Sequence, residues 1–245
     1  MLESSQSMVD RVVAILGSFS RARSQLGLAE IARLTDLPKS STHRILQQLV
    51  TARWVERVDG DYRLGLGIFE IGSLVAHHNR LVDLARPLMR ELSSHRLTTH
   101  LAVLDGTDVV YLEKVDGSLA GPLPSRVGGR LPAHCTGVGK TLLAHLPEAE
   151  LENYLAHRLE QRTPSTIASP DGLRRELAQI RSAGFGMDHG EAVSGFVCVA
   201  APVFDRSGAR AAISVGAPGS RVDPQQLTGP IRHAATALSR RLSAA

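Results

Sequence analysis

Three elements that follow one another between residues 28 and 65 decide the fold of the first part of the chain. Their sequence is LAEIARLTDLPKSSTHRILQQLV over residues 28–50 and VDGDYRLG over residues 58–65. Apolar residues in the first stretch recur at the spacing of two short helices, and Pro38 suits the start of the second because its missing N–H is not needed there. In the second stretch an Asp-Gly pair lies between two β-prone runs, which is typical of a hairpin turn.

A helix before this stretch completes the pattern. Its apolar face follows the i, i+3, i+4, i+7 spacing and consists of Val9, Val12, Val13 and Leu16. Ser7 followed by Asp10 resembles a capping box at its start. Three helices and a hairpin in this order are typical of a winged helix-turn-helix, which we expect over residues 1–67.

The third helix presents a polar face that suits DNA. Residues 37–55 contain Lys39, Arg44 and Arg53 and no acidic residue. Outward polar side chains can donate to phosphates or to base edges in a major groove, and basic residues beside a hairpin turn can contact phosphate. The candidate DNA contacts are Lys39, Ser40, Ser41, Thr42, Arg44 and Gln47 on the helix and Arg57 and Arg63 beside the turn. A helical domain with a merely solvated polar face, or one that docks proteins, is the alternative.

The pattern changes after the hairpin. We expect a linker helix over residues 68–80, whose apolar residues could pack on this chain or on another copy of it. Beyond it, HLAVLDGTDVVYLEKV (100–115) and VCVAAPVFDRSGARAAISVGA (197–217) each predict two strands around a turn. Helices are expected over 141–146, 147–159, 171–183 and 224–242. The second part, residues 81–245, is therefore predicted to be α+β.

Composition excludes several classes of protein. The chain has 245 residues, of which 43% are hydrophobic, so it can bury a core, and its net charge of +4 permits a polyanionic partner. Its only cysteines, Cys135 and Cys198, argue against a disulfide scaffold and suit a reducing cytosol. The longest uncharged apolar run, residues 195–204, is shorter than the roughly 18 residues that span a bilayer. Without a signal-peptide pattern, the chain is expected to be cytoplasmic and to contact no membrane.

These stretches resemble the IclR (isocitrate lyase regulator) family of bacterial transcription factors. The resemblance continues through ARPLMREL, RVGGRLPAHCTGVGKTLLA and RTPSTIASPDGLRRELAQIRSAGFGMDHGE and covers Val9 to Leu242. It implies a winged-helix domain, a linker helix and a GAF-like effector-binding domain over residues 81–245. It also implies a ligand-responsive regulator, not an enzyme, that binds an inverted-repeat operator in double-stranded DNA as a homodimer or homotetramer. Repression of a catabolic operon is the expected mode, and activation is the alternative.

A glycine turn in the second part is a candidate ligand site. TGVGKT over residues 136–141 does not complete a phosphate-binding loop, because His134 stands where its first glycine belongs. Backbone N–H groups of Gly137 and Gly139 could bind a carboxylate at a helix start, or the glycines could simply permit a tight loop. The resemblance implies that this turn lines the effector pocket. The effector-binding residues it implicates are Ala120, Leu123, Gly137, Val138, Asp188, Cys198 and Ser214.

Gly216 is a departure from the resemblance, because the family often has a serine there. Loss of that donor would enlarge the site, which favours a larger or flatter organic acid, such as an aromatic one, over the smallest acids. A zinc site formed by histidines, cysteines and Asp188, or a cysteine-dependent enzyme, is the remote alternative. No CxxC or HxxxH spacing supports a metal, and Cys198 lies in mid-strand, where a thiol is usually inert. We therefore expect no metal, no cofactor and no catalytic residue.

Overall fold

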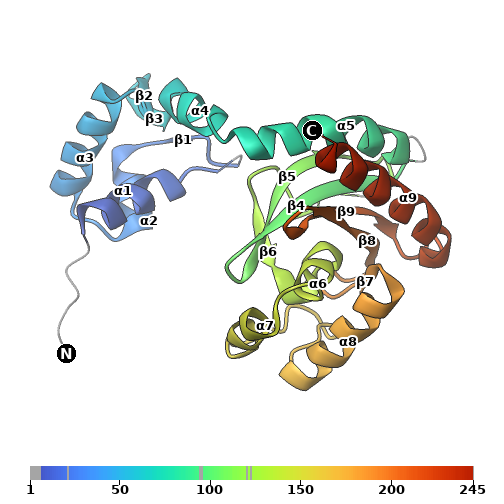
Figure 1. The fold of residues 1–245 in the computed structure, drawn as a ribbon. Coiled ribbons are helices and arrows are strands. Elements are labelled where there is room, and N and C mark those ends of the chain that lie inside the picture. The colour runs from blue at the N-terminus through green and yellow to red at the C-terminus, as the bar shows by residue number, and fades with distance from the viewer. Residues whose placement is uncertain (1–6, 21, 94–95, 120, 122, 245) are drawn as a thin grey trace. The chain divides into compact units, whose positions relative to one another are not determined.

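The computed structural model describes residues 7–20, 22–93, 96–119, 121 and 123–244. The chain divides into two compact units, residues 1–76 and 77–245 (Figure 1). The predicted fold class, a helix-turn-helix unit followed by an α+β unit, is confirmed. No helix of the described residues is long and apolar enough to cross a membrane.

The first unit is a helical domain with a small sheet. Its elements are α1 (Met8–Gly17), β1 (Gln25–Leu26), α2 (Leu28–Thr35), α3 (Lys39–Thr51), β2 (Val55–Val58), β3 (Asp61–Leu64) and α4 (Leu66–Ser73). The strands form an antiparallel sheet in the order β1-β3-β2. The expected capping box is present, since Ser7 Oγ accepts the amide N–H of Asp10 at 3.1 Å and the Asp10 carboxylate accepts that of Ser7 at 2.9 Å.

Turn residues and a compact core fix this unit. Asp59 (φ 52°) and Gly60 (φ 92°) both have the positive φ that a tight hairpin turn requires. The buried core joins α1, α2, α3 and the hairpin through Ile15, Ile31, Leu46 and other apolar side chains. α3 is thereby held with one side inward and the other in solvent.

The second unit is built on a six-stranded sheet in which every neighbouring pair is antiparallel, in the order β6-β5-β4-β9-β8-β7. Its strands are β4 (Thr98–Asp105), β5 (Asp108–Val115), β6 (Arg130–Pro132), β7 (Gly186–His189), β8 (Phe196–Asp205) and β9 (Gly208–Pro218). Its helices are α5 (Ala76–Ser93), the 3₁₀ turn η1 (Ala133–Cys135), α6 (Gly137–Leu143), α7 (Glu148–Leu155), α8 (Pro170–Ala183) and α9 (Pro224–Ser243).

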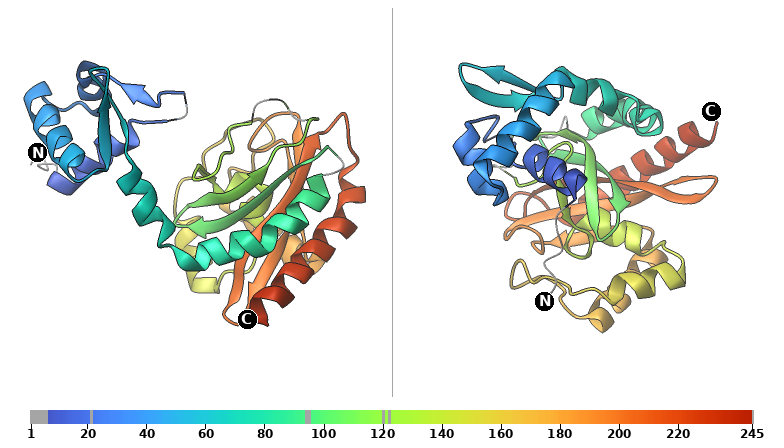
Figure 2. Two further views of the ribbon diagram at one scale, coloured as in Figure 1. Left: turned by 90° about the horizontal axis from the view of Figure 1, so that it is seen from above. Right: turned by 90° about the vertical axis from the view of Figure 1, so that its left-hand side faces the viewer.

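The helices cover the sheet on both faces. α5 and α9 lie on one face, where Ile213 and Val215 of β9 join their apolar side chains in a single core (Figure 2). α6, α7 and α8 cover the other face, where the core includes Ala200 and Ala212. Because side chains alternate along a strand, Ser214 lies on this second face, as does its neighbour across the β4–β9 pair, His100.

Several boundaries differ from those predicted. α4 ends at Ser73 and α5 begins at Ala76, so residues 68–80 span the end of one helix and the start of the next instead of one continuous linker helix. β6 and β7 were not predicted. α6 begins at Gly137, before the predicted start at residue 141, because Thr136 caps it: Thr136 Oγ1 accepts the Gly139 N–H at 3.1 Å.

Candidate nucleic-acid interface and ligand pocket

The outer face of α3 carries most of the predicted DNA contacts. Its apolar side chains are buried against the core of the first unit, which leaves the polar ones in solvent. Lys39, Ser40, Arg44 and Gln47 are exposed, and Ser41 is half-buried. No carboxylate lies on this helix. The face can therefore donate hydrogen bonds to an anionic surface without internal competition from its own helix.

Thr42 does not belong to this face. Its side chain is fully buried, and its hydroxyl donates to the carbonyl oxygen of Pro38 at 3.1 Å. The helical spacing that turns the apolar side chains of α3 inward turns Thr42 inward with them. The prediction of a DNA contact by Thr42 was therefore wrong, because its side chain is buried.

The two hairpin arginines differ in their surroundings. The Arg57 side chain is exposed, and its guanidinium carbon lies 5.9 Å from the centre of the Tyr62 ring. Arg63 forms a half-exposed ion pair with Glu56 on the neighbouring strand. A phosphate would meet Arg57 directly, whereas Arg63 would first have to leave Glu56.

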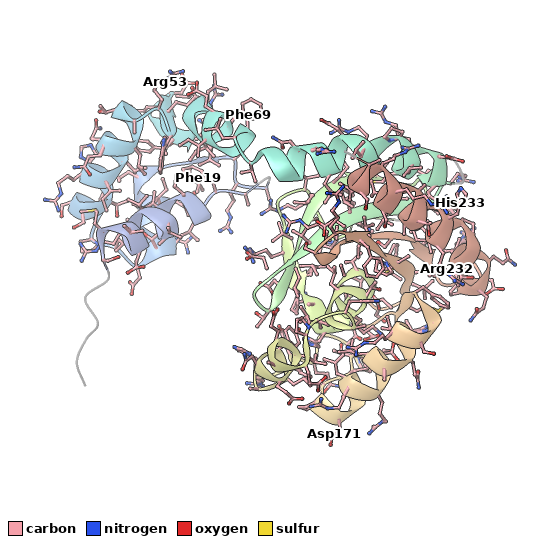
Figure 3. All side chains as sticks on the ribbon, in the orientation of Figure 1. Phe19, Arg53, Phe69, Asp171, Arg232 and His233 are labelled. Carbon is pink, nitrogen blue, oxygen red and sulfur yellow. The ribbon has the colours of Figure 1, made fainter. Side chains whose placement is uncertain are left out.

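Several apolar side chains on and just after α4 are exposed. Phe69 is 73% exposed and projects from the helix (Figure 3), and Leu66 and Leu74 are 68% and 78% exposed. Ile71 and Val75 are exposed as well, at 50% and 42%. Large exposed apolar side chains concentrated in one short segment suit a contact with another molecule.

The second unit contains a small cavity of about 30 Å³ on the face of the sheet that carries α6. Cross-strand pairing places Cys198 opposite Asp188 and Ser214 opposite His100, which gathers polar groups at this end of the sheet. The lining residues are His100, Tyr111, Leu123, Pro124, Ser125, Leu131, Thr136, Gly137, Val138, Asp188, Ala192, Val193, Phe196, Cys198 and Ser214.

Most of the predicted effector-binding residues therefore converge. The cavity is lined by Leu123, Gly137, Val138, Asp188, Cys198 and Ser214. Ala120 lies outside the described residues.

Gly216 does not line the cavity, and its missing side chain does not enlarge the site. A Cβ at this position would lie 2.7 Å from Cys198 Cβ and 2.8 Å from the Phe196 ring. Neighbouring side chains, the ring of Phe196 among them, therefore occupy the space that the glycine leaves. The expectation of a larger site was wrong on this point, although Phe196 adds an aromatic wall.

Sequence reasoning missed several lining residues, of which His100 is the most informative. Its Nε2 lies 2.9 Å from Ser125 Oγ, its Nδ1 lies 3.5 Å from Ser214 Oγ, and its ring centre is 5.1 Å from that of Tyr111. Burial and the nearby Lys114 lower the pKa of His100 to about 3, so the imidazole is neutral at pH 7. His100 and Ala102 lie two residues apart in β4 and therefore share a face, and this spacing could have placed His100 on the inner face.

Asp188 is the carboxyl group of the pocket. It is buried, and its Oδ1 accepts the amide N–H of Glu191 at 2.6 Å. Burial raises the pKa of Asp188 to about 7, although the hydrogen bond from Glu191 opposes the shift. The side chain can thus exist with or without its proton near neutral pH.

The cysteines are poorly placed for catalysis. Burial raises the pKa of both thiols, that of Cys135 to about 12, so neither is a thiolate at neutral pH. Among the described residues, no group of three or more His, Cys, Asp or Glu side chains could hold a metal ion.

The glycine turn is shaped by packing. A Cβ on Gly139 would lie 2.2 Å from the Ala133 oxygen, and one on Gly137 would lie 2.7 Å from Cys198 Sγ. The N–H of Gly139 donates to Thr136 Oγ1 at 3.1 Å. This amide is thus not free to bind a carboxylate, contrary to the expectation for Gly139.

Two family models match the chain, one in each unit. Residues 8–59 match the IclR helix-turn-helix domain, and residues 73–240 match the bacterial transcriptional regulator IclR C-terminal domain. The chain is 38% identical over 242 residues to the HTH-type transcriptional regulator XynR of Escherichia coli (strain K12), covering 96% of each. It is 33% identical to the HTH-type transcriptional repressor AllR of Klebsiella pneumoniae, over 89% of this chain and 82% of that one.

Solved structures give the same match. An IclR homolog complexed with 4-hydroxybenzoate from Microbacterium hydrocarbonoxydans has a TM-score of 0.90 and 32% identity, over 98% of this chain and 100% of that one. The IclR of Thermotoga maritima has a TM-score of 0.78 and 29% identity, over 96% of this chain and 98% of that one.

Proposed function

Because the chain belongs to the IclR family of bacterial transcriptional regulators, we propose that it represses transcription from an operator until a small organic acid binds its second unit. Membership rests on models that match residues 8–59 and 73–240 and on relatives aligned over most of their length. As a family member, it is a DNA-binding, ligand-responsive regulator. The repressor named among its relatives favours repression, and activation is the alternative.

The observation that carries the DNA-binding role is the acid-free outer face of α3. In a helix-turn-helix, the second helix of the pair lies in the major groove. The proposed contacts are Lys39, Ser40, Ser41, Arg44 and Gln47, with Arg57 and Arg63 on the phosphates beside the groove. Phosphate contacts set position and affinity, while contacts to base edges set sequence preference.

Dimer formation through α4 completes the DNA-binding role. The apolar side chains of Leu66, Phe69, Ile71, Leu74 and Val75 are exposed in a single chain, and the same segment of a second copy would cover part of them. Two copies related by a two-fold axis would bind the two halves of an inverted repeat. A tetramer would consist of two such dimers.

The effector is proposed to be an aromatic acid of about the size of 4-hydroxybenzoate. Tyr111 and Phe196 provide aromatic walls, and His100, Ser125 and Ser214 provide polar hydrogen-bonding groups. The structural neighbour at TM-score 0.90 has 4-hydroxybenzoate bound. Since benzene occupies a cavity of about 150 Å³, the walls of a 30 Å³ cavity must move outward when such an acid enters.

The proposal includes no catalytic step, metal or cofactor. The buried, protonated thiols of Cys135 and Cys198 do not suit a nucleophile. We place the protein in the cytoplasm, where its DNA is.

Capture of sheared DNA from the source genome by the purified protein tests the regulator role. The experiment is done at about 150 mM salt, which weakens binding that rests on phosphate contacts alone. We expect enrichment of one or a few promoter regions that share an inverted repeat, and their neighbouring genes would shortlist the effector. Enrichment of no fragment, with or without aromatic acids, would contradict the proposal.

A further inference from the structure

A cluster of buried ionisable groups adjoins the pocket and holds more acids than bases. Lys140 Nζ, fully buried, lies 2.5 Å from Glu191 Oε1 and 2.8 Å from Glu176 Oε1. The amide N–H of Glu191 donates to Asp188 Oδ1 at 2.6 Å. Glu191 Oε2 is buried and has no hydrogen-bond partner among the described residues. The ammonium group of Lys140 therefore lies near three carboxyl groups, those of Glu176, Glu191 and Asp188. It is already paired with two of them, Glu176 and Glu191.

The pocket itself offers no cation to an acidic ligand. Among the described residues that line it, none is lysine or arginine, and His100 is neutral. Lys114, whose charge acts on His100, is paired with Asp116 and donates to the backbone oxygen of Ser125. Its polar groups are hydroxyls, the imidazole, a thiol and the carboxyl group of Asp188.

The groups that face Asp188 do not supply a positive charge to the pocket either. Cys198 lies opposite it on β8, Tyr111 and Cys135 act on it from β5 and η1, and Glu191 follows it in the chain. Burial keeps the thiols and the phenol protonated. Lys140 is the cation that acts on Asp188, and its ammonium group is paired with Glu191 and Glu176.

An ionised Asp188 would therefore repel a carboxylate effector. Two like charges in a buried site disfavour each other, and the usual outcome is that one of them keeps a proton. A protonated carboxyl group has an O–H that can donate to the effector.

We propose that Asp188 recognises the effector in its protonated form, donating its O–H to the carboxylate of the bound acid, so that binding above neutral pH takes up one proton from solvent. This inference rests on the proposed function, in which the effector is an organic acid. The raised pKa of Asp188, about 7, supports it, because binding then requires only a modest further shift. The effector stays a carboxylate, and the proton comes from water or buffer.

Isothermal titration calorimetry with 4-hydroxybenzoate measures this uptake directly. Titrations at pH 8 are done in buffers of different ionisation enthalpy. The slope of the observed binding enthalpy against the ionisation enthalpy of the buffer gives the number of protons taken up. We expect a slope close to one for the wild type and a Kd that rises about tenfold from pH 8 to pH 9, since one proton is required. The uncharged analogue 4-hydroxybenzamide, titrated in parallel, should show a slope near zero.

Asp188→Asn removes the titration but keeps a hydrogen-bond donor. It should bind 4-hydroxybenzoate with a slope near zero and a Kd that does not change between pH 6 and pH 9. Asp171→Asn is the matched control, because Asp171 lies exposed at the start of α8 (Figure 3), and it should behave as the wild type does.

The outcomes separate this inference from the proposed function. Binding by the wild type without proton uptake, or binding that strengthens as pH rises, overturns the inference and leaves the proposed function standing. Absence of binding by the wild type and by Asp188→Asn, at pH 6 as well as pH 8, overturns the aromatic acid of the proposed function and the inference with it.

Discussion

At the scale of single residues, Lys140 shows how a motif can mislead. In the sequence it belongs to a glycine-rich run that invites a phosphate, yet in the structure it is fully buried and pairs with Glu176 and Glu191. Burial by itself would lower the pKa of this lysine, but the two glutamates outweigh it and the pKa is raised. The ammonium group is therefore a structural cation that joins α6, α8 and the segment after β7.

Lys140→Met should accordingly destabilise the second unit. Removing one partner of a buried ion pair leaves uncompensated charge and costs about 3–5 kcal/mol. The measurement is the free energy of unfolding in urea at pH 7, with Lys39→Met on the exposed face of α3 as control, for which a change within about 0.5 kcal/mol is expected. A loss below about 1 kcal/mol for Lys140→Met would contradict this role.

Asp188 should make stability depend on pH in a defined direction. Its pKa is about 7 in the folded protein against an ordinary 3.8, so between these values the folded state binds a proton that the unfolded state lacks. Stability from this group is therefore present below about pH 4 and is lost as pH rises to about 7.

Asp188→Asn should consequently unfold at higher urea concentration than the wild type at pH 8. Its free energy of unfolding should be larger by a few kcal/mol at most, since one pKa unit corresponds to about 1.4 kcal/mol. The advantage should shrink as the pH is lowered to 4. An advantage that stays constant over this range would show that Asp188 does not titrate as described.

Arg44 is the residue on which sequence preference is expected to depend. Arg44→Ala should weaken operator binding by about 1–3 kcal/mol and relax the preference for operator over unrelated DNA. Fluorescence anisotropy with both DNAs checks this, with the exposed Arg33→Ala on α2 as control. An equal loss on both DNAs would instead identify Arg44 as a phosphate contact.

At the scale of elements, strong periodicity predicted most of the structure. The three helices, the hairpin and the long strands β4, β5, β8 and β9 follow from apolar spacing and turn residues. β6 and β7 escaped prediction because they are short edge strands that exist through pairing with β5 and β8. The start of α6 was misplaced because Gly137 and Gly139 are poor helix formers, required here by close packing.

The pocket was only partly predictable for a related reason. Alternation in a strand assigns side chains to a face, but it does not say which loop folds over that face. Ser125 comes from such a loop, and its contact with His100 spans 25 residues. The packing of Phe196 against Gly216 depends on the positions of β8 and β9 together.

The exposed apolar side chains on α4 lead to a prediction about self-association. Phe69→Glu should weaken self-association, because covering an aromatic side chain of this size contributes about 1.5–3 kcal/mol, and a charge would resist burial. Sedimentation equilibrium of the full chain measures the effect. Val127→Glu, which changes an exposed apolar residue of the second unit, is the control. If both variants associate as the wild type does, the dimer does not use α4.

At the scale of the whole molecule, the two functions lie in different units. DNA is proposed to meet α3 in the first, and the effector to enter the cavity in the second. The units are joined at the start of α5, between residues 76 and 77. An effector can change DNA binding only if it binds two arrangements of the protein with different affinity, and the coupling is then reciprocal.

Control of DNA binding by the effector is tested most directly by the affinity of the protein for a captured operator fragment, measured by fluorescence anisotropy with and without saturating 4-hydroxybenzoate. We expect the Kd for the operator to rise by about 5- to 150-fold when the acid is bound. Binding to unrelated DNA should change no more than in a sodium chloride control. Operator affinity that stays the same while calorimetry shows the acid bound to the protein would contradict effector control of DNA binding.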